Sequence, residues 1–408
     1  MKLTETDKNR LNSLSNEVRH ELVSHILPFW EGLKDSERGG FYGLLDFNLK
    51  LEKNAVKGCI LNSRILWFFS SAYRLLGDED IFPYARHAYK FLMEKCLDPD
   101  YGGLFWSVNA DGTVYDSTKH TYNQAFAIYA LSAYYEVSHE QAALETALKL
   151  FELIEKNCTD STGYLESFTR DFKPESNEKL SENGVLAEKT MNTLLHVLEA
   201  YTSLFNVSRD GRVKERLCFI LRQFAGKIWN PEKKRQEVFF DKNLNSLIDL
   251  HSYGHDIETS WLIDRATEVL GEDEYTRLIS PISLEIAGQI YKKAYREHSL
   301  MTECENGIDD TKRVWWVQAE SVVGFLNAFQ KSGDQKFLDA AEDIWNYISE
   351  KIVDKRPGSE WFWYLDKNGI PDTRQPIVEP WKCPYHNGRM CFEVIERVAQ
   401  FFMGENND

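Results

Sequence analysis

The chain lacks the patterns that mark membrane, secreted and multidomain proteins. Its 11 prolines are dispersed, and no Pro/Ser-rich or low-complexity segment divides its 408 residues. No stretch approaches the roughly 18 apolar residues of a membrane helix, and the N-terminus, MKLTETDKNR, has no apolar signal-peptide core. We therefore predict a single domain over residues 1–408, located in the cytoplasm and without membrane contact.

Basic residues and paired cysteines are also scarce. Lys and Arg total 48 against 64 Asp and Glu, a net charge of −16, so binding to nucleic acid or anionic lipid through counterion release is not expected. The seven cysteines are scattered and form no C-x-x-C pair, which favours free thiols over a disulfide framework.

Cofactor motifs are missing as well. The sequence has no G-x-G-x-x-G fingerprint, no P-loop and no G-x-S-x-G elbow. His251 and His255, with Glu258, imitate the spacing of metal ligands on a helix, but Gly254 predicts that His251 lies before the helix begins. We therefore expect neither a cofactor nor a metal.

Aromatic residues, in contrast, are abundant. They make up 13% of the chain, as 11 Trp, 19 Tyr and 24 Phe. Aromatic faces suit the C–H faces of sugar rings, although a large helical core can use the same residues as filler. Composition alone leaves both interpretations open.

A helical pattern recurs six times, roughly every 60 to 70 residues. Its apolar copies begin near Leu61, Asn123, Asn192, Ile257, Gln318 and Asn387. More amphipathic helices are expected between them, at residues 8–30, 80–96, 140–157, 211–228, 274–293 and 335–353.

The period is longer than the 34 to 47 residues of helical solenoids, which leaves room for an insertion in each repeat. Aromatic runs beside turn residues predict short hairpins at residues 39–46, 102–112, 163–168, 237–241 and 360–369. We predict an all-α (α/α)6 barrel of six inner and six outer helices with short β-hairpins at one end. An open α-solenoid is the alternative.

Polar residues gather at the starts of the apolar helices, where Asn62, Asp256 and Asn387 are candidate N-caps. In parallel helices these residues would share one mouth, where helix N-termini favour developing negative charge and keep histidines neutral. Lone histidines are more often structural, but the shared placement of His196, His255 and His386 favours a function. The other residues at these starts are Arg64, Tyr122, Asn123, Asn192, Glu258, Trp315, Trp316, Glu320 and Trp381.

Four segments resemble the N-acylglucosamine 2-epimerase superfamily and look most like its cellobiose 2-epimerase branch. They are AEKTMNTLLHVLEAYTSLF (187–205), YGHDIETSWLIDRA (253–266), WWVQAESVVGF (315–325) and WKCPYHNGRMCFEVIERV (381–398). The resemblance implies an (α/α)6 barrel that inverts C2 of the reducing-end sugar of β-1,4-linked disaccharides, without cofactor or metal.

The resemblance also implies roles for individual residues. His255 and His386 match the general acid/base pair, His196 a supporting histidine, Arg64 an arginine on the reacting oxygens, and Glu258 a carboxylate beside His255. Trp316 or its neighbour Trp315, and Trp381, match aromatic platforms for sugar rings, and Tyr122 and Asn192 match polar pocket residues.

The reaction removes a proton alpha to an aldehyde and returns one to the opposite face of a cis-enediolate, so we predict that His255 and His386 face each other across C2. Glu258 is expected to fix a tautomer of His255. Rival functions are a monosaccharide or N-acylglucosamine 2-epimerase, an aldose–ketose isomerase, a glycoside hydrolase using two of Asp256, Glu258 and Glu320, and a non-catalytic binding module. The expected partner is a disaccharide, and the expected assembly is a monomer or weak homodimer.

Overall fold

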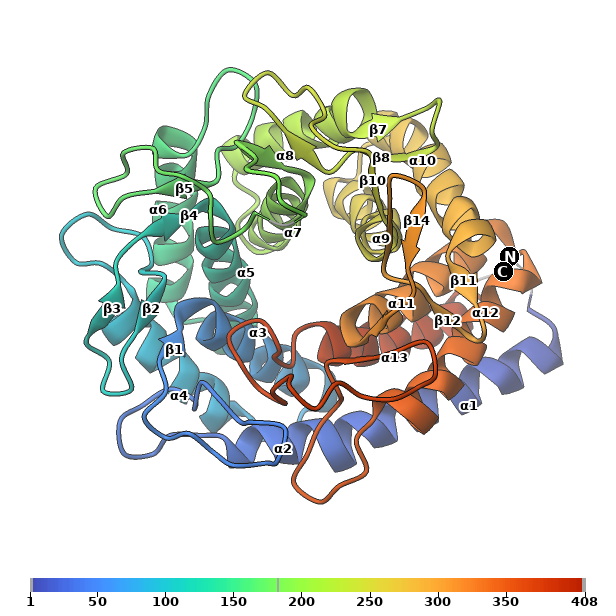
Figure 1. Ribbon diagram of the computed structural model, residues 1–408, viewed down its shortest axis with the longest axis horizontal. Coiled ribbons are helices and arrows are strands. Elements are labelled where there is room, and N and C mark those ends of the chain that lie inside the picture. Colours follow the sequence, from blue (N-terminus) through green and yellow to red (C-terminus); the bar gives the residue numbers. More distant parts are fainter. Residues whose placement is uncertain (1–2, 182, 406–408) are drawn as a thin grey trace.

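The computed structural model describes residues 3–181 and 183–405, and in this part of the chain the helices form two concentric rings (Figure 1). The inner ring confirms the six apolar helices expected from the repeat. They are α3 (Cys59–Leu76), α5 (Thr121–Ser138), α7 (Met191–Ser208), α9 (Tyr253–Leu270), α11 (Trp315–Ser332) and α13 (His386–Glu405).

The outer ring follows the amphipathic segments, and four of its helices contain a π-helical turn. It consists of α1 (Glu5–Glu21) with the turn Leu22–Ile26 and α2 (Leu27–Gly32), α4 (Phe82–Phe91) with Leu92–Cys96, α6 (Gln141–Asn157), α8 (Gly211–Gln223) with Phe224–Ile228, α10 (Asp273–Lys293), and α12 (Gln335–Tyr347) with Ile348–Ile352.

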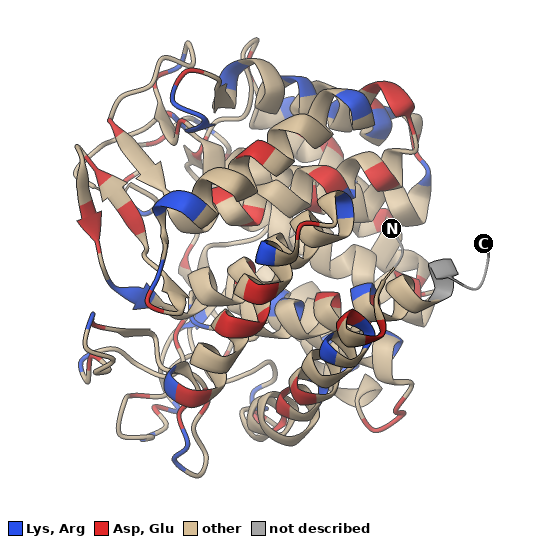
Figure 2. Ribbon diagram, turned by 90° about the vertical axis from the view of Figure 1, so that its right-hand side faces the viewer, with Lys and Arg blue, Asp and Glu red and all other residues tan. Residues whose placement is uncertain are grey.

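Packing explains why the two kinds of helix differ in sequence. Each inner helix touches the next, and α13 returns to α3, so the ring closes and the inner helices are buried on nearly every side. Each outer helix packs with its buried apolar residues on its inner partner. Figure 2 shows charged residues spread along the helices on the side in view. A closed ring agrees with the predicted barrel and not with an open solenoid. None of the described helices is long and apolar enough to cross a lipid bilayer.

The inner helices end alike. Five consecutive ones, α3 to α11, terminate at a residue in the left-handed conformation: Gly77, His139, Arg209, Gly271 and Gly333. Such an end lets the chain reverse sharply into the next outer helix. Glycine adopts this conformation without the steric penalty that a Cβ atom brings.

Short strands link neighbouring repeats at one end of the barrel. The strand before an inner helix pairs, antiparallel, with a strand of the next insertion, and the isolated bridge Leu45–Val378 joins the first loop to the last. The strand pairs are β1 (Lys57–Gly58) with β2 (Ser107–Val108), β4 (Lys119–His120) with β5 (Ser167–Phe168), β6 (Lys189–Thr190) with β9 (Phe239–Phe240), β10 (Leu250–Ser252) with β13 (Glu303–Glu305), and β15 (Arg313–Val314) with β16 (Tyr364–Leu365).

Most of the hairpins predicted from the aromatic runs are not formed within a single insertion. Segment 102–112 pairs with the strand that follows it, whereas 163–168, 237–241 and 360–369 each supply one strand to the preceding repeat, and 39–46 makes only isolated bridges. The hairpins are β2 with β3 (Val114–Asp116), β7 (Trp229–Asn230) with β8 (Arg235–Gln236), β11 (Tyr295–Arg296) with β12 (Ser299–Leu300), and β13 with β14 (Ile308–Asp310).

The expected N-caps are wrong, because the inner helices begin earlier. Asn62 and Asp256 are the fourth residues of α3 and α9, and Asn387 is the second of α13. Asn62 accepts a hydrogen bond from the backbone of Phe41, as Gln318 does from that of Leu300. These buried side chains therefore hold the insertions in place around the mouth of the barrel.

Candidate active site

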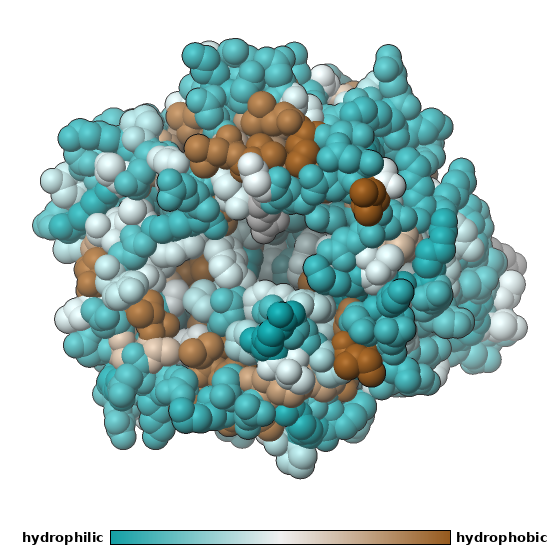
Figure 3. All heavy atoms as spheres, viewed as in Figure 1, coloured by the Kyte–Doolittle hydropathy of each residue, from teal (hydrophilic) through white to brown (hydrophobic). Residues whose placement is uncertain are grey.

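A cavity of about 360 Å³ opens at the amino-terminal ends of the inner helices, where the space-filling view is hollow (Figure 3). This volume falls in the range of small-molecule sites, roughly 300 to 1,000 Å³. The ten residues that were given a role from the sequence lie in its wall: Arg64, Tyr122, Asn192, His196, His255, Glu258, Trp315, Trp316, Trp381 and His386. Asn123 and Glu320, which also stand near helix starts, do not line it.

The repeat explains the convergence. Arg64, His196, Glu258 and Glu320 are each the sixth residue of their inner helix, on α3, α7, α9 and α11. Equivalent positions on neighbouring parallel helices lie at the same depth in the ring. Residues separated by more than 250 positions in the chain thus reach one chamber.

His255 and His386 lie against the same indole. The ring centroid of Trp316 is 4.9 Å from that of His255 and 5.3 Å from that of His386. Burial lowers the pKa of His255 to about 3, and burial next to Arg389 and Arg64 lowers the pKa of His386 well below its ordinary value. Both imidazoles are therefore neutral at pH 7 and able to accept a proton.

Different partners orient the three histidines. Nδ1 of His386 lies 2.8 Å from Oε1 of Glu320, and Nδ1 of His196 lies 2.9 Å from Oε2 of Glu199. Because an ionised carboxylate only accepts hydrogen bonds, these contacts place the proton on Nδ1 and leave Nε2 free. His255 has a hydroxyl partner instead, Oγ of Ser252 at 2.8 Å from its Nδ1.

The expectation that Glu258 fixes the tautomer of His255 is wrong. Oε1 of Glu258 binds the Arg389 guanidinium, and its Oε2 has no hydrogen-bond partner among the described protein groups. Arg389 on α13 takes Oε1 of Glu258, while the hydroxyl of Ser252 lies beside Nδ1 of His255.

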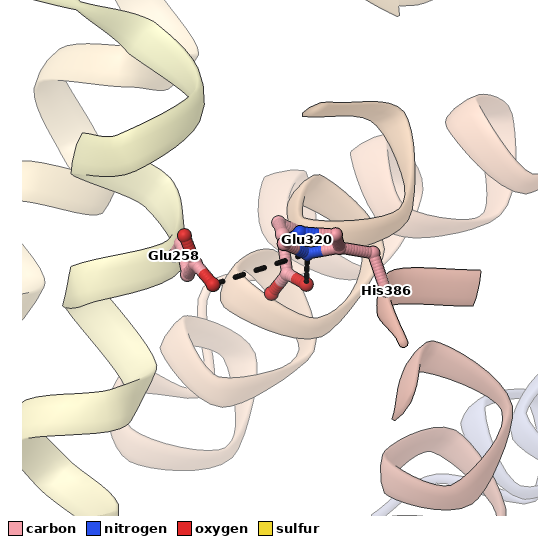
Figure 4. Close-up of side chains that lie close together, drawn as sticks. All are labelled: Glu258, Glu320 and His386. Carbon is pink, nitrogen blue, oxygen red and sulfur yellow. Dashed lines mark hydrogen bonds and ion pairs between the residues drawn. The ribbon is translucent and has the colours of Figure 1, made fainter. Parts of the chain in front are cut away.

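Arg389 joins three carboxylates from three helices. Its Nη1 donates to Glu199, and its Nη2 donates to Glu258 and, at 2.7 Å, to Glu320. Figure 4 shows Glu258 and Glu320 approaching His386 from two sides. The guanidinium, only 1% exposed, thus links the supports of His196 and His386.

The three carboxyl groups that share the Arg389 guanidinium differ in pKa. Burial opposes the charge of Glu199, but Arg389 lowers the pKa of that carboxyl to about 2. Burial and the proximity of Glu320 raise the pKa of Glu258 to about 8, and burial raises the pKa of Glu320. Of the three carboxyl groups, Glu199 is thus the one held most firmly in the ionised form, and Glu258 takes up a proton most readily.

Arg64 is held beside Tyr122. Its Nη2 donates to the Tyr122 hydroxyl at 2.9 Å, and its guanidinium lies 4.1 Å from the ring of Phe126 and 4.8 Å from that of Tyr385. Its Nε has no hydrogen-bond partner among the described groups. This fixed, buried cation can donate to the oxygens of a bound ligand.

Glu258, Glu320 and His386 could also be considered as metal ligands, because one ligand atom from each lies within 4.8 Å of the others. However, Arg389 donates to the Oε1 atoms of both carboxylates and already supplies the compensating positive charge. His251 and His255 do not form a pair of metal ligands on one helix, because His251 lies on β10 and contacts Asp256 at 2.8 Å. The absence of a metal requirement stays a prediction.

Several residues of the site were not identified from the sequence. Arg389 and Tyr385 lie within the segment WKCPYHNGRM, and Glu199 lies three residues after His196, which places it on the same helix face. The cavity wall also includes Lys179, Leu180, Ser252, Thr302, Glu303, Val314 and Trp363 from the insertions and strands.

Known proteins share both sequence and fold with this chain. The family model of N-acylglucosamine 2-epimerase (GlcNAc 2-epimerase) matches residues 39–387. The cellobiose 2-epimerase of Eubacterium cellulosolvens is 50% identical, with 94% of this chain and 98% of that protein covered.

Two solved structures superpose closely. A sugar epimerase from a ruminal bacterium has a TM-score of 0.93 and 48% identity, covering 94% of this chain and 99% of that one. The cellobiose 2-epimerase of Bacillus thermoamylovorans has a TM-score of 0.91 and 48% identity, covering 95% and 100%. The chain therefore belongs to the N-acylglucosamine 2-epimerase family and is a carbohydrate 2-epimerase.

Proposed function

We propose that the protein inverts C2 of the reducing-end sugar of β-1,4-linked disaccharides, converting cellobiose to glucosyl-mannose and lactose to epilactose. The observation that carries this proposal is the placement of two neutral imidazoles, His255 and His386, against one indole in a cavity large enough for two sugar rings. The identity to cellobiose 2-epimerases supports the choice of substrate.

In the proposed reaction the sugar ring opens and one imidazole removes the proton from C2. The other histidine, after taking a proton from solvent, delivers it to the opposite face of the planar cis-enediolate, and the first histidine releases its proton to solvent. Positioned proton transfer typically contributes about 10² to 10⁴ in rate. Nε2 of His386 is free for this role because its Nδ1 is bound to Glu320.

Arg64 is assigned to the developing negative charge on the enediolate oxygens. Its guanidinium is 2% exposed and fixed by Tyr122, so it needs no reorganisation as charge develops. Preorganised donors of this kind are typically worth about 3 to 4 kcal/mol. Trp316 and Trp381 are assigned to stacking on the sugar rings, and His196, Asn192 and Tyr122 to the polar wall.

A two-carboxylate hydrolase fits this site poorly. Asp256 is held by His251 and Gln236, away from the cavity wall. Glu258 and Glu320 both accept from Nη2 of Arg389, which holds them together, whereas hydrolysis needs carboxyl groups on either side of a glycosidic bond. A binding module would have no use for two oriented neutral bases.

Proton NMR of cellobiose incubated with the protein in deuterated buffer tests substrate, reaction and residues together. We expect glucosyl-mannose that carries solvent deuterium at C2, and no epimer with His255→Asn or His386→Asn. Release of free glucose would instead indicate a hydrolase. Full retention of the original hydrogen in single-turnover product would contradict the two-histidine mechanism.

The same experiment with other sugars decides among the remaining members of the family. Faster reaction of mannose or N-acetylglucosamine than of cellobiose would indicate a monosaccharide isomerase or an N-acylglucosamine epimerase. Reprotonation of the enediolate at C1 would yield the ketose, so we expect slow formation of lactulose from lactose.

A further inference from the structure

A second cavity lies at the carboxyl ends of the inner helices, on the side of the barrel opposite the mouth. We call it the far cavity, and its volume is about 180 Å³. Its wall is formed by the later turns of α3, α5, α7 and α9 and by the middle of α13. None of the proposed steps at the mouth uses this space.

The far cavity has an open rim and a buried floor. Arg74, Glu136 and Asn206 at its rim are exposed, whereas Glu199 and Arg389 at its floor are 5% and 1% exposed. A small molecule can therefore enter from solvent and reach the guanidinium that supports the active-site histidines.

Ion pairs in the wall disfavour a charged ligand. Arg265 pairs with Glu393 and Arg74 with Glu396, each at 2.6 Å, and Arg389 pairs with Glu199. The helix carboxyl ends add partial negative charge, which repels anions. A neutral molecule with several hydroxyl groups can donate to these carboxylates and accept from the guanidinium groups without breaking a pair.

Aromatic side chains complete the wall. The rings of Trp67 and Tyr129 stack with centroids 5.3 Å apart, and Trp261 and Phe392 lie nearby. Aromatic rings beside carboxylates and arginines form a surface that suits the mixed polar and C–H faces of a sugar. The far cavity has half the volume of the mouth, and this smaller size suits a molecule of one sugar ring.

We propose that the far cavity is a second binding site for a neutral, hydroxyl-rich molecule the size of one sugar ring. Its occupant contacts Glu199 and Arg389, whose other contacts hold His196, Glu258 and Glu320 at the mouth. An occupant of the far cavity would therefore touch the same two residues that contact the active-site groups.

The probe is a methyl glycoside, whose ring cannot open, so that binding is measured without turnover. In crystals of the full chain soaked with methyl 1-seleno-β-D-glucopyranoside, we expect an anomalous selenium peak in the far cavity. In solution, titration calorimetry with methyl β-D-glucopyranoside should show two sites for the wild type. Ser203→Trp, which fills the far cavity, should weaken the second site at least tenfold.

Ser13→Trp, on the exposed face of α1, is the matched control and should keep both sites. If Ser203→Trp does not fold, as judged by circular dichroism, Asn206→Trp at the exposed rim replaces it. The proposal is overturned if no selenium peak occupies the far cavity, if the peak occurs only in crystals, or if the Trp variants keep two sites. The readout is binding, so it is independent of the C2 reaction at the mouth.

Discussion

Glu320 binds His386 directly: Oε1 of the carboxylate lies 2.8 Å from Nδ1 of the imidazole. Among the described residues, the hydrogen-bond partner of His255, the proposed partner in proton transfer, is the hydroxyl of Ser252 at the same distance. An imidazolium formed at His386 would face a carboxylate, whereas one formed at His255 would not. The two bases are therefore unequal.

Neutralising the carboxylate of Glu320 should impair catalysis more than removing the hydroxyl of Ser252. We expect Glu320→Gln to lower kcat by about 10- to 100-fold, the loss typical when a carboxylate that orients a histidine at a metal site is removed. Ser252→Ala should cost less than tenfold. Steady-state kinetics with cellobiose measure both, and equal losses in the two variants would contradict the assignment.

The pH dependence of activity should lack an ordinary histidine transition. Burial lowers the pKa of His255 to about 3, below its usual 6.5, so the neutral form persists as the pH falls through 6.5. We expect kcat/KM to stay level from pH 7 down to about pH 5. An acidic limb near pH 6.5 that moves in Ser252→Ala would show that His255 titrates normally.

Glu258 should make the protein less stable at alkaline pH. Its pKa is raised to about 8 in the folded state, so the stability it contributes is present below its unfolded pKa and is lost as the pH rises through about 8. Glu258→Gln removes this titration, and we expect its Tm relative to wild type to rise by about 3 °C between pH 5 and pH 9. A difference in Tm that is independent of pH would contradict this.

Arg64 should act mainly on the chemical step. We expect Arg64→Lys to lower kcat by about 10² to 10³, with a smaller change in KM, because lysine retains the charge but not the planar fork of donors. Tyr122→Phe removes the hydrogen bond at 2.9 Å and serves as the milder comparison. A loss confined to KM would place Arg64 in substrate binding alone.

The left-handed helix ends allow a test of stability outside the site. A Cβ at Gly271, φ 70°, would meet no atom within 4 Å, so Gly271→Ala isolates the cost of the backbone conformation. We expect it to destabilise the protein by about 1 kcal/mol, and His139→Gly, at φ 54°, to stabilise it by a similar amount. Thermal unfolding measures both, and a change of the same sign in the two variants would refute the argument.

Much of the fold could be predicted because the apolar repeat is strong. The observed inner helices begin within a few residues of the expected starts, and the outer helices follow the amphipathic segments closely. The caps could not be predicted, because Asn62 and Asp256 resemble caps in type but bind insertions that are distant along the chain. The pairing of strands from neighbouring repeats could not be predicted either, because the paired strands are distant along the chain.

The convergence of the candidate residues on one cavity was predicted from their shared position at helix starts. Glu199, three residues after His196, and Ser252, three before His255, lie within reach by helical spacing and could have been identified. The partner of His386 could not, because that contact joins two helices: Glu320 on α11 reaches His386 on α13, and Arg389 likewise reaches Glu199 across the ring. Local spacing carries no information on such pairs. Glu320→Gln and Ser252→Ala test the roles of these partners in catalysis.

The bridge between Leu45 and Val378 and the packing of α1 on α13 join the first repeat to the last, so the ring of repeats is continuous. The ring can therefore keep the same arrangement when the polypeptide begins at a different repeat. A circularly permuted gene that joins the present ends through a flexible linker and opens the chain after Gly271 should encode a protein with the same chamber.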